Sequence, residues 1–379
     1  MRERDGFRPG RIVIASGGTG GHFYPGLALA EELRAAGGWE PLFLVRKNDI
    51  SIGALQERYY PYVETDVVSF PRGPSPLACA AFFRKLASSV LACARIFSDF
   101  RPDFVFGTGG YVSFPAVAAA ALKGVPSMIH DSNAVLGLAN RLSGRFASVV
   151  ALGLPVARNP FASKTELTGT PIRECFSREI PPSAARRHFG LEDGVPVVLV
   201  FGGSQGSRAI NQAALGAAKE LTREGARFGL LHVTGRRDYA EIAEGYRKAG
   251  LDGLPRLKVL AYCDEMEMAY AAADLAVCRS GGGTISELSR FRKPSVLVPL
   301  PGSPGGHQKA NAMVLASAGA AILLEERPEF AEEFSSSLRK LLSDPAGIDG
   351  LKRGWAGLDL PDPARAAGEL RKIIERYQR

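Results

Sequence analysis

The sequence predicts an α/β protein built from two Rossmann-type domains. Each half opens with a short apolar strand, a glycine-rich loop and a helix, which together form the first unit of a doubly wound sheet. In the first half these are residues 11–15, the loop SGGTGGH and residues 25–36; in the second they are 195–201, the loop GGSQGS and 209–221. With 379 residues, 46% of them hydrophobic, the chain is long enough to bury two such cores.

The remaining elements follow the same alternation. Further strands are expected over residues 41–45, 103–106 and 127–129 in the first half and over 230–234, 258–261, 271–277 and 294–299 in the second. The periodic pattern breaks at Pro171, so we place the domain junction between residues 172 and 173. Residues 363–379 have the pattern of a closing helix. Two sheets that face each other would leave a cleft, which is the expected site.

Charge and cysteine usage limit the class of protein. The net charge of +8 favours an anionic partner, such as nucleic acid, lipid headgroups or a phosphorylated substrate. The five cysteines form no CxxC pair, which favours free thiols in a reducing compartment over disulfides or zinc. The first residues are charged, and the sequence has no uninterrupted apolar run of about 20 residues. We therefore expect a protein that stays in the cytoplasm and does not cross a membrane.

The stretch CRSGGGTISEL, residues 278–288, is the strongest local signal. Three glycines between an apolar run and a helix that begins at Thr284 indicate a tight turn, whose amides and helix dipole face an anion. Glu287, three residues into that helix, could accept hydrogen bonds from two adjacent hydroxyls of a ribose. The pattern thus favours a nucleotide over a bare phosphate. A glycine turn followed by an ordinary first-turn acid is the alternative.

The first glycine loop departs from the dinucleotide fingerprint. Phe23 stands where GxGxxG has its third glycine, and the next strand runs into Arg46 and Lys47 without an acid. A nicotinamide cofactor is therefore only weakly indicated. The loop still lets a ligand approach the backbone closely, with His22 at its rim. A structural histidine is the alternative, but a position at the C-terminal end of a strand favours a functional one.

Two more strand ends in the first half carry glycine or polar residues. The segment GTGGYVS follows one strand, and HDSNAVLGLAN follows the next. Because the carboxyl ends of parallel strands meet at one edge of a sheet, these segments and the first loop would line one rim of the cleft. Tyr111 and Ser113 are candidate rim groups. Asp131 and Asn133 lie on the same rim, or only cap a helix.

The segment over residues 77–100 is apolar but carries basic residues. A helical wheel places seven apolar side chains on one face: Cys79, Phe82, Phe83, Leu86, Val90, Cys93 and Phe97. Such a stripe most often packs on a core. Alternatively, the start of the segment rests on an anionic membrane, where each basic residue adds about 1 kcal/mol of binding free energy. That surface would comprise Arg72, Phe82, Phe83, Arg84 and Lys85.

Seven segments occur in the order and spacing of the MurG family: GGTGGHFYPGLALA, GGYVSFPA, HDSNAVLGLAN, GTPIR, GGSQGSRAIN, CRSGGGTISEL and HQKANA. Over nearly its whole length the chain thus resembles the N-acetylglucosaminyltransferases that convert lipid I to lipid II in peptidoglycan synthesis. The resemblance implies a GT-B fold, with two Rossmann-like domains facing each other. Residues 1–172, with the closing helix packed back on them, would form the acceptor and membrane-associated domain, and residues 173–362 the donor domain.

The resemblance also implies the substrates and their contacts. The donor would be UDP-N-acetylglucosamine, and the acceptor a muramoyl-pentapeptide on undecaprenyl diphosphate at the cytoplasmic face of the inner membrane. Glu287 would take the ribose hydroxyls, Arg173 and the Ser204 loop would meet the diphosphate, and the Cys263 backbone would face uracil. The full set of implied donor contacts is Thr19, Gly20, Gly21, Asn133, Arg173, Ser204, Cys263, Gly282, Gly283, Thr284, Ile285, Ser286, Glu287 and Gln308.

The implied reaction is a single displacement, with inversion, at the anomeric carbon of the donor sugar. Gln308 and Asn133 would bind the hydroxyls and the acetamide of this sugar. The acceptor hydroxyl is a poor nucleophile at neutral pH, so a general base should accelerate the reaction by about 100- to 10,000-fold. His22 is the first candidate for that base and Asp131 the second. The sequence has no clear DxD segment, so we expect no cofactor or obligatory metal ion, and full activity in excess chelator.

Two other interpretations remain open. Another GT-B UDP-sugar transferase, or a UDP-N-acetylglucosamine epimerase, would share the fold and the donor pocket without using a lipid acceptor. A non-enzymatic membrane or nucleic-acid binding module would account for the basic charge, but would not need His22 or Glu287. The resemblance favours the enzyme, acting on an anionic membrane surface and without a nucleic-acid partner.

Overall fold

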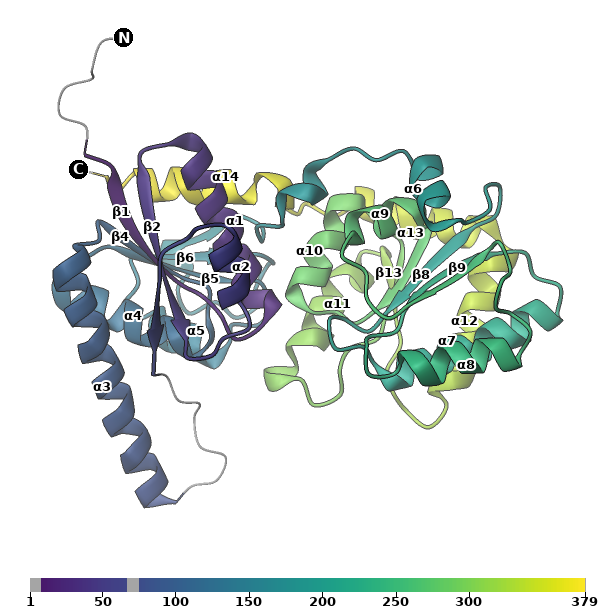
Figure 1. Ribbon diagram of the computed structural model, residues 1–379, viewed down its shortest axis with the longest axis horizontal. Coiled ribbons are helices and arrows are strands. Elements are labelled where there is room, and N and C mark those ends of the chain that lie inside the picture. The colour runs from purple at the N-terminus through teal and green to yellow at the C-terminus, as the bar shows by residue number, and fades with distance from the viewer. Residues whose placement is uncertain (1–7, 67–74, 379) are drawn as a thin grey trace, which may run out of the picture. The chain divides into compact units, whose positions relative to one another are not determined.

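The computed structural model describes residues 8–66 and 75–378, which form two α/β units (Figure 1). The first unit holds the chain up to Glu174 together with Pro361–Arg379, and the second holds Cys175–Leu360. The predicted junction lies two residues too early, so Arg173 belongs to the first unit. Arg173 contacts the ring of Tyr24 in α1, which ties this segment to the first unit.

The first unit contains a seven-stranded parallel sheet with the strand order β3-β2-β1-β4-β5-β6-β7. Its strands are β1 (Gly10–Ala15), β2 (Trp39–Arg46), β3 (Tyr62–Thr65), β4 (Phe104–Gly107), β5 (Ser127–Asp131), β6 (Val149–Leu152) and β7 (Thr165–Leu167). In β1, Ile12 and Ile14 face a core shared with the first and last helices, whereas Val13 and Ala15 face the opposite core. Both faces are therefore buried, as in other doubly wound sheets.

In the described part of this unit the helices are α1 (Gly20–Ala36), α2 (Ile52–Glu57), α3 (Pro76–Phe100), α4 (Gly110–Lys123), α5 (Leu138–Ser143) and α14 (Pro363–Glu375), with a short 3₁₀ turn at Ala162–Lys164. The closing helix α14 lies beside α1 although the two are at opposite ends of the chain (Figure 1). Leu370 and Ile374 of α14 enter the core beneath α1. Arg371 donates to Glu32 of α1 at 3.0 Å, which fixes the two helices side by side.

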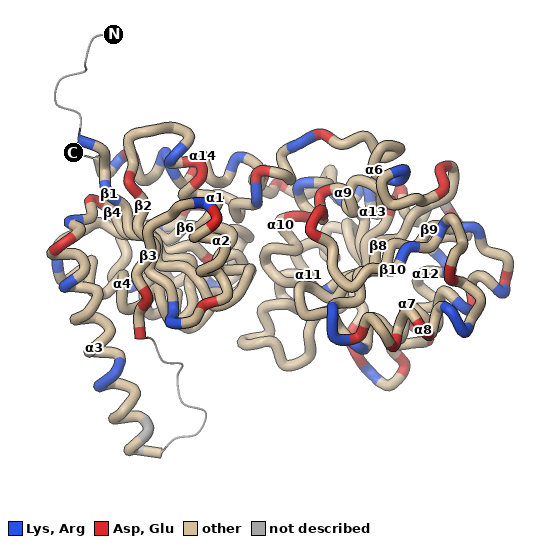
Figure 2. The backbone as a smooth tube through the Cα atoms, viewed as in Figure 1, with Lys and Arg blue, Asp and Glu red and all other residues tan. Residues whose placement is uncertain are grey.

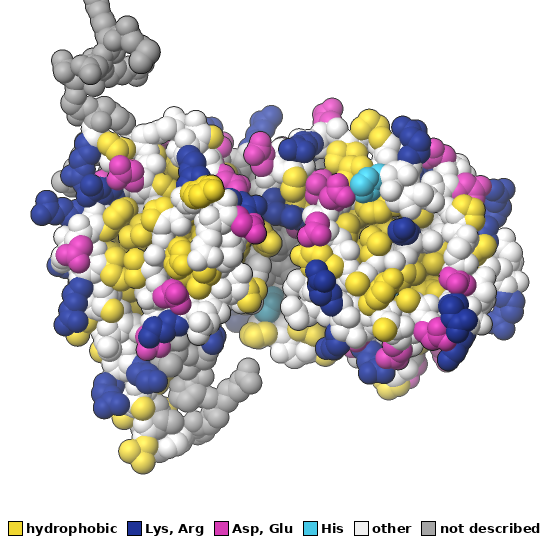
Figure 3. Space-filling view, viewed as in Figure 1, with side chains coloured by type: hydrophobic (Ala, Val, Ile, Leu, Met, Phe, Trp, Pro, Cys, Tyr) yellow, Lys and Arg dark blue, Asp and Glu magenta, His cyan; other side chains and the backbone are white. Residues whose placement is uncertain are grey.

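Helix α3 has two halves with different surroundings. Cys93 and Phe97 in its C-terminal half are buried in the core. Its N-terminal half extends beyond the body of the unit (Figure 1), and there Phe83 is 60% exposed while Phe82 is half-buried. Packing of the apolar stripe on a core is therefore wrong at Phe83, whereas the membrane alternative stays a prediction. Figure 2 marks Lys and Arg positions along this projecting half, and Figure 3 shows basic side chains together with hydrophobic ones there.

The second unit contains a six-stranded parallel sheet with the order β10-β9-β8-β11-β12-β13. Its strands are β8 (Val197–Phe201), β9 (Gly229–Val233), β10 (Leu257–Leu260), β11 (Leu275–Cys278), β12 (Ser295–Leu297) and β13 (Ala321–Leu323). The strand predicted to begin at Ala271 begins instead at Leu275, because Ala271 and Ala272 form the last turn of the preceding helix. Asp274 separates the two elements by accepting hydrogen bonds from Val197 N and Arg186.

The helices of the second unit are α6 (Pro182–Phe189), α7 (Arg208–Arg223), α8 (Tyr239–Lys248), α9 (Met266–Ala272), α10 (Gly282–Phe291), α11 (His307–Ser317), α12 (Phe330–Ser343) and α13 (Pro345–Ala356). Short 3₁₀ turns occur at Glu174–Ser177 and Pro304–Gly306. In both sheets the strand order reverses beside the first strand of the unit, between β1 and β4 and between β8 and β11. Ligands of open α/β sheets bind at such switch points.

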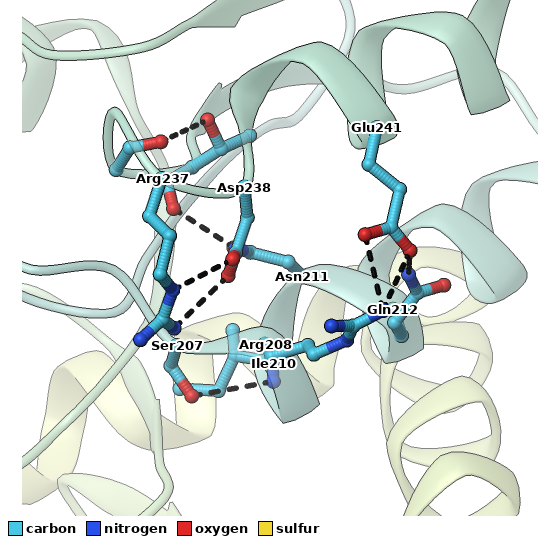
Figure 4. A network of polar contacts seen from close by, with 10 residues as sticks. Ser207, Arg208, Ile210, Asn211, Gln212, Arg237, Asp238 and Glu241 are labelled. Atoms are coloured by element: carbon cyan, nitrogen blue, oxygen red, sulfur yellow. Dashed lines mark hydrogen bonds and ion pairs between the residues drawn. The ribbon is translucent and has the colours of Figure 1, made fainter.

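A buried polar network holds the start of α7, directly after the loop GGSQGS (Figure 4). The Asn211 amide donates to the Thr234 carbonyl at 2.9 Å and to Asp238 at 3.0 Å, and this fixes its orientation. Its Oδ1 atom therefore faces Nε2 of His232 at 3.0 Å and must accept a hydrogen bond from the Nε2–H group. The other ring nitrogen of His232, Nδ1, lies 3.0 Å from the Tyr246 hydroxyl. His232 is thus a neutral, fully bonded core residue.

We predict that the stability of the second unit falls in acid because of His232. Burial lowers the pKa of His232 from 6.5 to about 3, so below pH 6.5 the unfolded chain binds a proton that the folded unit does not. The contribution of His232 to the free energy of unfolding is therefore fully present above pH 6.5. It should fall by about 1.4 kcal/mol for each pH unit below pH 6.5. Urea unfolding at several pH values, monitored through hydrogen exchange of the β9 amides, measures this slope.

His232→Gln should flatten the slope, whereas His188→Gln, at an exposed histidine on α6 of the same unit, should leave it unchanged. An equal slope in the His232 variant and the parent chain would contradict this assignment.

Candidate active site

His22 lies in the first turn of α1, because this helix begins five residues earlier than the sequence suggested. Gly20 and Gly21 adopt helical geometry, with Thr19 as the extended N-cap residue. The Thr19 carbonyl accepts hydrogen bonds from the N–H groups of His22 at 3.1 Å and Phe23 at 2.9 Å. Two glycines that were predicted to belong to the loop therefore form the helix N-terminus and carry the histidine with it.

A hydrogen bond to the end of β4 fixes the imidazole of His22. Its Nδ1 atom lies 2.9 Å from the carbonyl oxygen of Thr108. A carbonyl can only accept, so Nδ1 carries the proton, and the lone pair of the neutral ring lies on Nε2. Gly109 and Gly110 leave room for the ring, since a Cβ at these positions would lie 3.3 and 3.7 Å from it. The segment GTGGYVS thus positions a base.

Asp49 supports the first glycine loop from below. Its Oδ2 accepts from Gly18 N at 2.7 Å, and its Oδ1 accepts from the N–H of Ser51 at 3.0 Å and the Ser51 hydroxyl at 2.6 Å. An acid does therefore follow β2, three residues after Arg46, but it binds the loop backbone. Asp49 was not predicted, because the residues directly after the predicted strand, Arg46 and Lys47, are basic.

Asp131 holds a loop and is poorly placed to act as a base. Its carboxylate is buried and accepts from the Asn133 N–H at 3.0 Å and the Asn133 amide at 3.1 Å. It also accepts from Gly137 N at 2.8 Å and from the Asn140 amide at 3.0 Å. A protonated carboxyl could not keep all four bonds. The expectation that Asp131 is a second candidate base is therefore corrected, and His22 is the group whose geometry suits the role.

Two predicted rim groups of the first unit have different surroundings. The Ser113 side chain is fully buried; its hydroxyl accepts from Gly109 N at 2.9 Å and lies 3.0 Å from the Ala15 carbonyl. It therefore supports the glycine segment from inside and is no rim group. Tyr111 is 47% exposed and can meet a ligand.

Arg173 lies beside the first glycine loop. Its guanidinium carbon is 5.4 Å from the ring centroid of Tyr24, which is within the range of a cation–π contact. Tyr24 follows His22 by two residues on α1, and its ring lies against Gly20, where a Cβ would be 3.3 Å away. The stack therefore places a permanent positive charge near the start of α1.

The motif CRSGGGTISEL forms the end of β11 and most of α10. None of its three glycines has a positive φ, and α10 begins at Gly282, two residues earlier than predicted. The predicted tight turn is therefore wrong; the glycines instead give a helix N-terminus without side chains. Ile285 is fully buried and the Ser286 hydroxyl donates to the Gly282 carbonyl at 3.0 Å, so neither side chain faces a ligand. The first-turn N–H groups of Gly282, Gly283 and Thr284 have no acceptor within the helix.

Glu287 is the sixth residue of α10 and not the fourth, as a start at Thr284 had implied. Its Oε2 accepts a hydrogen bond from the Tyr270 hydroxyl at 2.9 Å. Tyr270 was not predicted, because an aromatic residue in the preceding helix α9 does not by itself indicate a contact with Glu287. Cys263, near the end of β10, is buried, and burial raises the pKa of its thiol to about 11. Its thiol is protonated at neutral pH, so only its backbone suits a ligand contact.

Arg279 joins three loops of the second unit, and the sequence analysis missed it. It is buried, and its Nη2 donates to the Ser207 hydroxyl at 2.7 Å. Its Nη1 donates to the carbonyls of Val298 and Pro299, both at 3.2 Å, and forms an ion pair with Glu326. The loop after β8, the start of α10 and the end of β12 are therefore fixed by one guanidinium.

The other predicted donor contacts lie on the loops that Arg279 joins or near them. Ser204 is exposed on the loop between β8 and α7. Gln308 is in the first turn of α11, and its Oε1 accepts from Leu300 N at 2.9 Å. Asn311 is buried and donates to the Ser280 carbonyl at 2.9 Å, which attaches α11 to the segment before α10.

A cavity of about 1200 Å³ in the first unit lies away from these groups. It is lined by Gly10, Asp103, Pro126 and Ser148, which are at the starts of strands. The glycine loops follow the C-terminal ends of strands, where ligands of α/β proteins bind. We therefore do not assign the cavity to the site. Within residues 8–66 and 75–378, no three His, Cys, Asp or Glu side chains gather closely enough to hold a metal ion.

Known proteins resemble the chain over both units. Residues 12–152 match the N-terminal domain and residues 197–348 the C-terminal domain of glycosyltransferase family 28. A UDP-N-acetylglucosamine--N-acetylmuramyl-(pentapeptide) pyrophosphoryl-undecaprenol N-acetylglucosamine transferase of Elusimicrobium minutum is 37% identical over 365 residues, 96% of this chain and 99% of the relative. The crystal structure of Acinetobacter baumannii MurG superposes with a TM-score of 0.77 at 26% identity, covering 97% of this chain and 100% of that one.

The chain belongs to the MurG family. Its two parallel-sheet units are therefore those of a GT-B glycosyltransferase, and the predicted fold class is confirmed. A Staphylococcus aureus MnaA–UDP structure shares the fold with a TM-score of 0.65, covering 97% of this chain and 96% of that one. At 13% identity this likeness concerns the fold alone.

We predict that Gly109→Ala lowers the transferase turnover of this MurG-family chain by about 100-fold, the effect of misplacing a catalytic group by about 1 Å. The new Cβ would lie 3.0 Å from the Asn140 amide and 3.3 Å from the His22 ring, at a φ of +97°. UDP affinity, measured by calorimetry, should not change. The matched control is Gly124→Ala, with a φ of +68° and nothing within 4 Å, which strains the backbone without touching the site. Equal turnover losses in both variants would contradict the prediction.

Proposed function

We propose that this chain transfers N-acetylglucosamine from UDP-N-acetylglucosamine to the 4-hydroxyl of the muramyl sugar of lipid I, which gives lipid II. The 37% identical relative carries the name of this activity, and the match spans 96% of this chain. The observation that carries the chemistry is the imidazole of His22, held by the Thr108 carbonyl so that Nε2 is basic. Another UDP-sugar transferase or an epimerase would share the fold, but the 37% identical relative carries the name of neither activity.

In the proposed step, Nε2 of His22 takes the proton of the acceptor hydroxyl as its oxygen attacks the anomeric carbon. The bond from that carbon to the UDP oxygen breaks as the new bond forms, so the configuration inverts and the product is β-linked. The Thr108 carbonyl keeps its hydrogen bond to Nδ1–H and so stabilises the imidazolium that results. A general base of this kind contributes about 100- to 10,000-fold to the rate.

On the donor side, amides and a helix dipole would meet the charge of the leaving UDP. The first-turn N–H groups of α10 and the helix dipole favour a diphosphate at this N-terminus. Glu287 would accept from the ribose hydroxyls, and Ser204 is exposed on the adjoining loop. Arg173, which belongs to the first unit, stays a predicted phosphate contact. These groups neutralise charge without a metal ion, so we keep the expectation that activity persists in excess chelator.

The projecting half of α3 is the proposed membrane contact, and the cytoplasmic face of the inner membrane is the proposed location of the enzyme. Phe83 and Leu77 are 60% and 84% exposed, and Arg84 and Lys85 are exposed beside them. Arg72, which was predicted to join them, lies outside the described residues. No helix in the described ranges is long and apolar enough to span a bilayer. Exposed apolar side chains beside basic ones suit peripheral binding to anionic lipid.

We predict that His22→Ala lowers turnover by about 100-fold or more while UDP affinity stays constant, because a base affects the rate and not donor binding. Glu287→Ala should instead weaken UDP binding by about 10- to 100-fold, the worth of a hydrogen bond to a charged group. The assay follows labelled N-acetylglucosamine from the donor to a lipid I analogue. Label transfer that does not require the lipid I analogue would favour another transferase or an epimerase. Full activity in both variants would contradict the proposed site.

We predict that Phe82→Glu with Phe83→Glu abolishes binding to anionic vesicles but preserves turnover on a soluble acceptor analogue. Burying one such side chain contributes about 1.5 to 3 kcal/mol, so losing two lowers vesicle affinity by about 100-fold or more. The control is Leu122→Glu, at another strongly exposed apolar residue of the same unit, in the last turn of α4. Vesicle binding that survives in the double variant, or is lost equally in the control, would refute the assignment.

A further inference from the structure

Tyr270 is fixed in the core of the second unit by an aromatic cluster, which comprises Phe176, Phe201, Tyr270 and Phe291. The Tyr270 ring is fully buried and stacks on Phe291, with centroids 5.4 Å apart and an interplanar angle of 15°. Phe201, the last residue of β8, meets it edge-on at 5.8 Å and 89°. Phe176 lies 6.1 Å away on the third side. Aromatic contacts of this kind hold a ring in one orientation.

The hydroxyl at the end of this ring is directed at Glu287. It donates to the Oε2 atom of the Glu287 carboxylate at 2.9 Å. The two residues come from α9 and α10, the helices before and after β11 in the chain, and these helices contact each other, so the bond joins them directly. The Glu287 charge also contributes, after burial, to raising the pKa of the Cys278 thiol at the end of that strand. Glu287 thus lies close to the C-terminal end of β11, where ligands of such sheets bind.

A glutamate side chain has three rotatable bonds, so its carboxylate can adopt many orientations. Recognition of two adjacent hydroxyls requires an orientation in which both carboxylate oxygens face them. A carboxylate has about four acceptor sites, and the tyrosine hydroxyl occupies one of them. A rigid donor at one oxygen therefore sets the plane of the carboxylate before a ligand arrives. Preorganisation of this kind increases affinity, because less freedom is lost on binding.

We propose that Tyr270 is a positioning residue that orients Glu287 for the ribose hydroxyls, so that preference for a ribonucleotide depends on a hydroxyl that does not touch the ligand. The inference rests on the proposed role of Glu287. A purely structural hydroxyl would instead only satisfy its own hydrogen bond. The two cases differ in which nucleotides are affected. A structural loss weakens every nucleotide alike, whereas a positioning loss affects only nucleotides that carry the ribose hydroxyls.

The test compares dissociation constants of UDP and 2′,3′-dideoxyuridine diphosphate, measured by calorimetry on the full chain. The parent chain should prefer UDP by about 10- to 100-fold, since the analogue leaves a charged acceptor unpaired. Tyr270→Phe, which removes one oxygen atom, should weaken UDP by about 3- to 10-fold, within the worth of one hydrogen bond. It should leave the analogue unaffected. In turnover, the KM for donor should rise with kcat unchanged.

Two further variants make the outcome specific. Glu287→Ala with Tyr270→Phe should bind UDP no more weakly than Glu287→Ala alone, because the hydroxyl acts through the carboxylate. Tyr246→Phe is the matched control, since Tyr246 is a buried tyrosine of the same unit whose hydroxyl bonds to His232. It should leave the preference for UDP unchanged.

Three outcomes would overturn the inference. If Tyr270→Phe weakens both nucleotides equally or neither of them, Tyr270 is only structural while the role of Glu287 stands. If the double variant is weaker than Glu287→Ala, the hydroxyl acts independently of the carboxylate. If the parent chain itself does not discriminate between the nucleotides, the proposed role of Glu287 fails and the inference fails with it.

Discussion

The hydrogen bond from the His22 imidazole to the Thr108 carbonyl is the contact on which the site of the first unit depends. It joins the first turn of α1 to the end of β4 and leaves Nε2 as the basic atom. The bond requires a glycine directly after Thr108, because a Cβ at Gly109 would crowd the ring. It also requires a fixed start of α1, which Asp49 supports through Gly18 of the preceding loop. The position of the proton on the His22 ring therefore depends on segments that follow three different strands, β1, β2 and β4.

The second unit uses buried polar side chains in the same way. Arg279 fixes the loop after β8 to the end of β12, and Asn211 fixes the start of α7 to the segment after β9. Tyr270 of α9 then holds Glu287 of α10. Such groups are costly to bury unless every bond is made, so each loop has essentially one arrangement. Binding groups on loops with one arrangement are preorganised, which is what an anionic leaving group requires.

The fold was predictable because its signals are local. A strand, a glycine loop and a helix recur at the start of each half, and seven motifs in family order point to the MurG family and the GT-B fold. Helix starts were missed at Gly20 and Gly282, because glycine is a poor helix former and only tertiary contacts show that the turn is helical. The roles of Asp131 and Tyr270 could not be predicted, because they depend on hydrogen-bond partners that no sequence pattern identifies. The partner of His22 is 86 residues away.

The central claim is that His22 presents a basic Nε2 atom to the acceptor, and ¹⁵N NMR of the imidazole tests it most directly. With ¹⁵N-histidine in the full chain, and His22→Gln used to assign the signal, the neutral ring should carry its proton on Nδ1. Adding a lipid I analogue should then shift the Nε2 resonance, because that atom accepts the hydrogen bond of the acceptor hydroxyl. A proton found on Nε2 of the neutral ring would contradict this role of His22. So would an Nε2 resonance that does not shift when the lipid I analogue is added.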